Sequence, residues 1–194
     1  MVKFKNLCVY CGSSNGPDKR FVELAEQLGS LIGANGHNLV YGGGRLGLMG
    51  IVASSTMQSG GKAIGYIPSH LDSKEGANTD LDELHIVDSM HTRKMRMSER
   101  ADAFLILPGG FGTLDELFEI ITWRQLSLHN KPIIVINAFG YWSKLEELFK
   151  QVIDNQFALE QHRSYVCFID SIDQVLETLE ECPAASREFD SRLA

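Results

Sequence analysis

The stretch that decides the fold reads Ala103-Phe104-Leu105-Ile106-Leu107, followed by Pro108-Gly109-Gly110-Phe111-Gly112-Thr113-Leu114-Asp115-Glu116. Its five consecutive apolar residues suit a buried strand. Apolar residues then recur at helical spacing, at positions 114, 117, 118 and 121. The order strand, glycine-rich turn and helix leaves free backbone N–H groups at the start of the helix, and such groups bind anions such as phosphate. Glu116 falls on the first turn of this helix, where it is either a partner of the helix dipole or a catalytic group.

Strand-like and helix-like runs alternate along the rest of the chain. Besides residues 103–107, we expect strands at residues 7–10, 38–41, 63–67, 84–87, 132–137 and 166–169. Further helices are expected at about residues 18–35, 47–59, 90–100, 141–155 and 172–179. Repeated βα units with apolar strands predict an α/β fold, a doubly wound parallel sheet with helices on both faces. We expect one domain over residues 1–182, with a polar excursion or lid at 69–83 and a flexible tail at 183–194.

Three of the expected strands end in glycine-rich turns, Gly12-Ser13-Ser14, Gly42-Gly43-Gly44 and Gly109-Gly110-Phe111-Gly112. Ligands of open parallel sheets bind outside the carboxyl ends of the strands, so we expect the three turns to meet at one edge. The second turn also matches the dinucleotide pattern G-x-G-x-x-G. The next strand, however, ends in Tyr66-Ile67-Pro68-Ser69, without the acidic residue that would hold a ribose. An NAD or FAD site therefore stays a minor alternative.

A cationic stretch, Asp88-Ser89-Met90-His91-Thr92-Arg93-Lys94-Met95-Arg96-Met97, stands out in this acidic chain. Arg93 falls on the first turn of a helix that starts at the carboxyl end of a strand, on the edge where the glycine turns meet. The planar guanidinium of arginine suits phosphate or carboxylate. For Arg96 and Arg100, a charged helix face that contacts solvent is as good an explanation as a binding role.

Composition and charge exclude several classes of protein. The net charge of −7 argues against nucleic acid as a partner. No apolar run approaches the roughly 18–20 residues of a membrane span, and no signal-peptide core follows Met1, so we expect a cytoplasmic protein. Cys8 and Cys11 would point to opposite faces of a strand, and Cys167 and Cys182 stand far apart in the sequence. We therefore expect reduced thiols, no metal and no cofactor.

These residues resemble a known family. Pro108–Glu116 matches the signature P-G-G-x-G-T-x-x-E, and Met90–Lys94 and Tyr41–Gly44 with Gly47–Gly50 match further parts. Over about residues 5–180 the chain resembles the LONELY GUY (LOG) family of cytokinin riboside 5′-monophosphate phosphoribohydrolases. The resemblance implies a Rossmann-like homodimer that hydrolyses the N-glycosidic bond of adenosine-type 5′-monophosphates, giving the free base and ribose 5-phosphate. Apolar residues on several faces of the helix after Gly112 agree with a partner subunit.

The resemblance also implies which residues act. Arg93 and Glu116 would be the catalytic pair, and the glutamate would stabilise an oxocarbenium-like sugar or direct water to it. The positions expected to contact the purine nucleotide are Gly12, Ser13, Gly43, Gly44, Glu75, Met90, Arg93, Lys94, Gly109, Gly110, Phe111, Gly112, Thr113, Leu114, Asp115, Glu116 and Thr122. The phosphate would dock on the turn at 110–113, with the ribose near Glu116.

Two choices stay open at this point. The alternative to an enzyme is a carrier of nucleotide or molybdenum cofactor on the same fold, for which the pair Arg93 and Glu116 would not be required. The substrate is either AMP or an N6-prenylated analogue. The sequence does not support the family's older label, lysine decarboxylase, because no lysine stands in an obvious Schiff-base context for pyridoxal phosphate.

Overall fold

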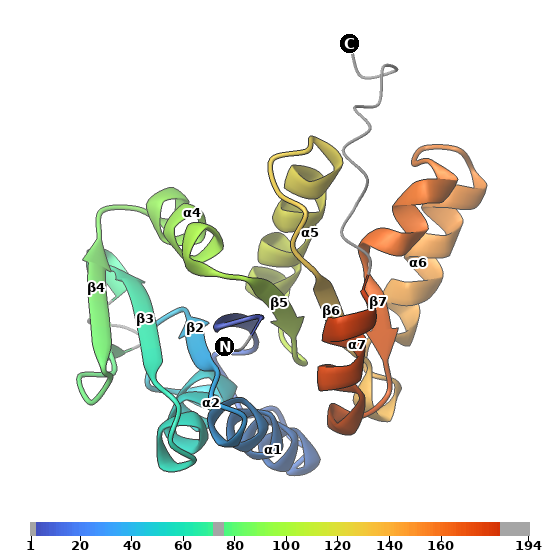
Figure 1. Ribbon diagram of the computed structural model, residues 1–194. Coiled ribbons are helices and arrows are strands. Elements are labelled where there is room, and N and C mark those ends of the chain that lie inside the picture. The colour runs from blue at the N-terminus through green and yellow to red at the C-terminus, as the bar shows by residue number, and fades with distance from the viewer. Residues whose placement is uncertain (1–2, 72–75, 183–194) are drawn as a thin grey trace.

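The computed structural model describes residues 3–71 and 76–182. Its centre is a seven-stranded sheet in the order β4-β3-β2-β1-β5-β6-β7, and each pairing between neighbouring described strands is parallel (Figure 1). The strands are β1 (Asn6–Tyr10), β2 (Asn38–Tyr41), β3 (Ala63–Pro68), β4 (Glu83–Val87), β5 (Ala103–Ile106), β6 (Ile133–Ile136) and β7 (Cys167–Ile169). The α-helices are α1 (Arg20–Ala34), α2 (Gly47–Gln58), α3 (Ser69–Leu71), α4 (Met90–Arg100), α5 (Phe111–Gln125), α6 (Ser143–Asp154) and α7 (Val175–Glu181).

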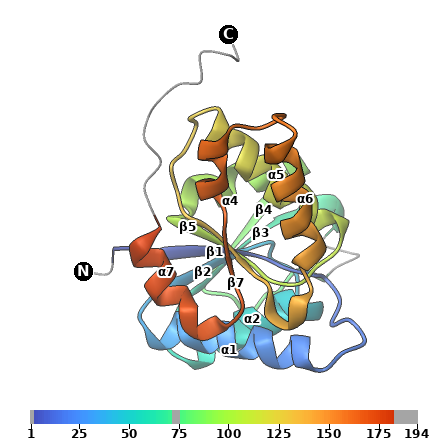
Figure 2. The same cartoon turned by 90° about the vertical axis from the view of Figure 1, so that its right-hand side faces the viewer.

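Helices cover both faces of the sheet, as the sequence predicted. One apolar core packs α1, α2 and α7 against one face, and a second packs α4, α5 and α6 against the other (Figure 2). The buried strands alternate between these cores, so that Cys8 lies in one and Cys11 in the other. The expectation that these two thiols point to opposite faces is confirmed.

The sequence of strands reverses at β1, which lies between β2 and β5. From β1 the chain builds the sheet outward through β4 in one direction and then returns to continue through β5 to β7 in the other. A doubly wound sheet opens a crevice at this switch point, outside the carboxyl ends of the strands. The fold therefore places the turns after β1 and β5 on either side of the expected binding crevice.

Most expected elements lie within one or two residues of their predicted bounds, and α4 matches its prediction. Within residues 3–71 and 76–182, three short 3₁₀ helices were not predicted: η2 (Ala138–Gly140), η3 (Glu160–Tyr165) and η4 (Ile172–Gln174), the last of which begins the expected final helix. A larger correction concerns Cys167 and Cys182. Their distance in the sequence suggested separate thiols, but the fold brings their Sγ atoms to 3.0 Å.

The described part of the excursion after β3 returns to the second glycine turn. The N–H of Arg45 donates to the carbonyl of Gly76, and the N–H of Asn78 donates to the carbonyl of Gly43, each at 3.0 Å. Backbone bonds therefore attach this segment to the turn that follows β2. Within the described ranges, no helix is both long and apolar enough to cross a membrane.

Candidate active site

The three glycine-rich turns meet at the carboxyl edge of the sheet. The N–H of Gly12 donates to the carbonyl of Pro108 at 3.0 Å. A Cβ on Gly109 would overlap the side chain of Thr113 and lie 2.9 Å from the backbone nitrogen of Gly12. Gly47, at a φ of 65°, lies so close to Ser13 that a Cβ would overlap that residue's backbone. These contacts require glycine, and they confirm the predicted convergence.

A cavity of about 260 Å³ opens beside these turns. It is lined by Cys11, Gly12, Ser13, Met49, Leu71, Met90, Arg93, Gly110, Phe111, Gly112, Thr113, Asp115 and Glu116. The first turn of α5 forms one wall. Gly110 is the N-cap of α5, and its carbonyl accepts a hydrogen bond from the N–H of Leu114. The N–H groups of residues 111–113 come before this bond, at the open end of the helix. Such groups, with the positive end of the helix dipole, suit a phosphate.

Arg93 and Glu116 form a buried ion pair in this cavity. The Nη2 of Arg93 lies 3.7 Å from Oε1 of Glu116, and their side chains are 6% and 9% exposed. At 3.7 Å the two charges attract without a short hydrogen bond. The Nε of Arg93 is buried, and among the described residues it has no hydrogen-bond partner. Because an unsatisfied buried donor is costly, the site suits a ligand oxygen or nitrogen at this position.

Local structure explains how Arg93 reaches the cavity. The hydroxyl of Ser89 accepts a hydrogen bond from the N–H of Thr92 and so caps α4, which places Arg93 on the first turn. The guanidinium then lies against the backbone of Gly42, at the end of β2. A Cβ on Gly42 would overlap the Arg93 guanidinium. The glycine is needed here for space, because its backbone does not occupy the left-handed region.

Lys94 connects α4 to α5 rather than lining the cavity. Its Nζ lies 3.0 Å from a carboxylate oxygen of Asp115 and 3.1 Å from one of Glu119. Burial alone would lower the pKa of Lys94, but these carboxylates raise it above the usual value. Since Asp115 and Glu119 flank Glu116 on α5, the lysine holds the helix that carries Glu116.

The thiol of Cys11 lies in the same cavity and is not a nucleophile. Burial, reinforced by the negative charge of Glu116, raises its pKa well above the usual range. A neutral thiol is a poor nucleophile and a poor metal ligand. Among the described lining residues, the buried charged side chains are thus those of Arg93 and Glu116.

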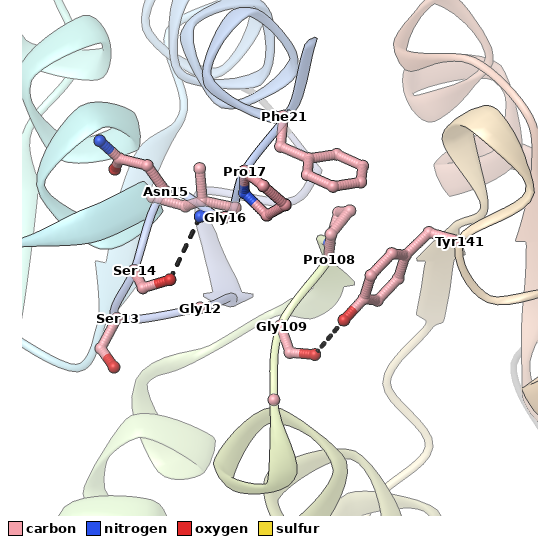
Figure 3. A pocket seen from close by; sticks show the side chains of 12 residues that line it. Gly12, Ser13, Ser14, Asn15, Gly16, Pro17, Phe21, Pro108, Gly109 and Tyr141 are labelled. Carbon is pink, nitrogen blue, oxygen red and sulfur yellow. Dashed lines mark hydrogen bonds between the residues drawn. The ribbon is translucent and has the colours of Figure 1, made fainter. Parts of the chain in front are cut away.

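A second cavity, of about 380 Å³, lies on the other side of the glycine turns and shares Gly12, Ser13 and Gly110 with the first. Figure 3 shows the ring of Tyr141 reaching across this cavity to the turn after β5. Its hydroxyl donates a hydrogen bond of 2.6 Å to the carbonyl of Gly109. The ring also meets Phe21 edge-on, at 5.4 Å between centroids. Tyr141 therefore supports the glycine-rich turn after β5.

The structure brings most of the predicted site residues to the first cavity. They are Gly12, Ser13, Met90, Arg93, Gly110, Phe111, Gly112, Thr113, Asp115 and Glu116. It does not bring Gly43, Gly44, Lys94, Leu114 or Thr122 to the lining, and Gly109 lines the second cavity instead. The carbonyl of Gly43 accepts from Asn78, and the hydroxyl of Thr122 donates to Phe118 within α5. Glu75 lies outside the described residues.

Three lining residues were not predicted, Cys11, Met49 and Leu71. Met49 stands inside the stretch Gly47-Leu48-Met49-Gly50, which the signature includes, so that stretch was a signal for it. The other two are apolar residues at the ends of elements. Only the fold shows that they face the crevice.

Comparison with known proteins agrees with this site. Residues 49–179 match a protein family described as "Possible lysine decarboxylase". Cytokinin riboside 5′-monophosphate phosphoribohydrolase LOG7 of Arabidopsis thaliana is 38% identical over 191 residues, which cover 98% of this chain and 88% of that protein. The probable cytokinin riboside 5′-monophosphate phosphoribohydrolase LOGL9 of Oryza sativa subsp. japonica is 40% identical over 179 residues, covering 92% of this chain and 79% of that protein.

Solved structures share the architecture at lower identity. The molybdenum cofactor binding protein of Rippkaea orientalis has a TM-score of 0.70 and 21% identity, covering 91% of this chain and 96% of that chain. The molybdenum cofactor carrier protein of Chlamydomonas reinhardtii has a TM-score of 0.70 and 15% identity, covering 92% of this chain and 97% of that chain. At such identities the likeness shows the fold alone. The sequence relatives show more, and together with the glycine turns and the pair Arg93–Glu116 they establish that the chain belongs to the LONELY GUY (LOG) family.

Proposed function

We propose that this protein hydrolyses the N-glycosidic bond of purine nucleoside 5′-monophosphates of the adenosine and cytokinin riboside type, releasing the free base and ribose 5-phosphate. The observation that carries the proposal is the buried pair Arg93–Glu116, which opens onto the same cavity as the N-terminus of α5. The names of the relatives at 38–40% identity support this substrate class.

In the reaction that we propose, the N–H groups at residues 111–113 hold the 5′-phosphate and so place the ribose beside Glu116. As the bond from C1′ to the purine nitrogen breaks, positive charge develops on the sugar, and the Glu116 carboxylate stabilises it. Water then supplies a hydroxyl group to C1′ and a proton to the purine. Arg93 pairs with the Glu116 carboxylate, and its Nε–H is available to a ligand atom.

The observed contacts do not favour decarboxylation. Within the described residues no lysine lines the cavity, and Lys94 beside it is held by two carboxylates. Such pairing keeps the amine protonated, whereas a Schiff base with pyridoxal phosphate needs a free amine. A carrier without turnover remains the alternative function, because proteins of this fold include molybdenum cofactor carriers. The buried pairing of Glu116 with Arg93 beside the N-terminus of α5 favours the enzyme, since a carboxylate at this place would repel a phosphate ligand and needs a role in turnover to explain it.

Product analysis tests the proposal. The purified protein is incubated separately with AMP, with N6-isopentenyl-AMP and with adenosine, and the products are separated by chromatography. We expect base and ribose 5-phosphate from at least one monophosphate and much slower release from adenosine, which lacks the group that docks on α5. Tight nucleotide binding with no base released over hours would instead identify a carrier.

We further propose that the protein works as a homodimer in the cytoplasm, without nucleic acid. Large apolar side chains are exposed on α5 and just after it, namely Phe111, Phe118, Leu126 and Leu128. Large apolar side chains exposed along one helix favour a protein interface, and the net charge of −7 disfavours binding to nucleic acid. Light scattering should give twice the mass of one chain, and the mass of a single chain would contradict the dimer.

A further inference from the structure

A pair of cysteines lies at the amino edge of the sheet, opposite the edge that carries the glycine turns. Cys167 is the first residue of β7, and Cys182 is the C-cap of α7. Their Sγ atoms are 3.0 Å apart, and both thiols are free. A disulfide has an S–S distance of about 2.05 Å, so the two sulfurs need to approach by only about 1 Å to bond.

A buried arginine lies beside the two sulfurs. Arg124, near the C-terminal end of α5, donates to the carbonyl of Tyr165 at 2.7 Å, and its guanidinium lies 5.0 Å from the centre of the Tyr165 ring. The hydrogen bond from Cys167 lowers the pKa of Cys182, and the charge of Arg124 lowers it further. Burial acts in the opposite direction, and the resulting pKa is about 6. The same hydrogen bond, together with burial, raises the pKa of Cys167. The pair thus combines one thiolate with one thiol near neutral pH, the combination that reactive cysteine pairs use.

We propose that Cys167 and Cys182 are a redox modification site, which hydrogen peroxide converts into an intramolecular disulfide. The Cys182 thiolate attacks one oxygen of the peroxide, which breaks the O–O bond and leaves a sulfenic acid and hydroxide. The sulfur of Cys167 then displaces the sulfenic hydroxyl group, its proton leaves with that group as water, and the S–S bond forms. Two thiols and one peroxide give one disulfide and two waters, and the two electrons from sulfur reduce the peroxide.

Other uses of these sulfurs fit the structure less well. Within residues 3–71 and 76–182, no group of three or more histidine, cysteine, aspartate or glutamate side chains is arranged to hold a metal ion. Cys8 and Cys11 belong to opposite cores, and burial raises the pKa of each well above the usual range. These two thiols therefore serve as internal controls in the same chain.

Thiol mapping tests the proposal and does not depend on the proposed hydrolase activity. The native full-length protein is treated with hydrogen peroxide, unfolded with an alkylating reagent and digested for mass spectrometry. We expect the loss of two of the four free thiols, a linked pair of peptides containing Cys167 and Cys182, and alkylated Cys8 and Cys11. The linkage should form faster as the pH rises through about 6, because the thiolate is the attacking species.

Variants separate the two steps. In Cys167→Ser the sulfenic acid on Cys182 should persist and be trapped by dimedone, whereas Cys182→Ser should yield neither product. Cys8→Ala is the matched control and should form the linkage at the wild-type rate. Failure of the wild-type protein to form the 167–182 linkage before it unfolds would overturn the proposal, as would linkage between two chains or equal oxidation of Cys8. The wild-type result stands even if a variant fails to fold.

Discussion

Replacing Glu116 with glutamine should slow hydrolysis strongly while leaving the protein folded. We expect kcat for base release to fall about 1000-fold, in the range typical for loss of a group that acts in the transition state. Glutamine keeps the size of the side chain but cannot stabilise a positive sugar or direct a water molecule toward it. The KM for the nucleotide should change little, because the substitution leaves in place the N–H groups of α5 on which we propose that the phosphate docks. Steady-state kinetics and circular dichroism measure the two effects.

The matched control is Glu146→Gln. Glu146 lies on the first turn of α6, one turn nearer to its helix N-terminus than Glu116 is in α5, and pairs with Lys150 at the surface. If Glu116 served merely as a partner of the helix dipole, both variants would behave alike, with a cost of about 0.3–1 kcal/mol of stability and full activity. A Glu116→Gln protein that retained most of the wild-type kcat would refute the catalytic role.

Substituting alanine for Gly42 should inactivate the enzyme by displacing Arg93. The new Cβ occupies the space of the guanidinium, so the arginine must leave its place beside Glu116. We expect kcat/KM to fall about 100-fold, as is typical when a catalytic group is misplaced by about 1 Å. The unfolding temperature should change little, because a flexible side chain yields to the methyl group and Gly42 does not need the left-handed conformation.

A double-mutant cycle isolates this mechanism. If Gly42→Ala acts through Arg93, it should have almost no further effect in a protein that already carries Arg93→Ala, because the group to be displaced is gone. Two losses of activity that multiply would show that the glycine acts in another way. Thermal unfolding of all four proteins of the cycle excludes a general loss of structure.

Much of this site was predictable from the sequence because parallel βα units restrict where turns can go. The strand 103–107 and the helix after the glycines were evident from periodicity, and the topology then required the turns after β1, β2 and β5 to share an edge. Both Arg93 and Glu116 lie on helices that start at this edge. Arg93 lies on the first turn of α4, as predicted, whereas Glu116 lies on the second turn of α5 and not on the first, because that helix begins at Phe111. Their predicted proximity therefore followed from the fold, before any distance was known.

The rest depended on contacts between elements that no local pattern records. Lys94 stands next to Arg93 in the sequence, yet successive residues of a helix differ in direction by about 100°, so its amine reaches α5 and not the cavity. The space that Gly42 leaves is filled by a side chain some 50 residues later in the chain, which a glycine pattern alone does not reveal. Cys167 and Cys182 meet because α7 packs back onto the sheet beside β7, and sequence separation says nothing about such a return.

The hydrogen bond from Tyr141 to Gly109 has a consequence for affinity. Because the hydroxyl fixes the carbonyl of the turn at 2.6 Å, the turn is already ordered before any nucleotide arrives. A loop that must be immobilised on binding reduces the observed affinity by the conformational entropy that it loses, whereas a turn fixed during folding does not. For the docking mode that we propose, a 5′-phosphate would meet a turn that is already fixed, so less of the free energy of its contacts with the first turn of α5 would be lost to ordering that turn.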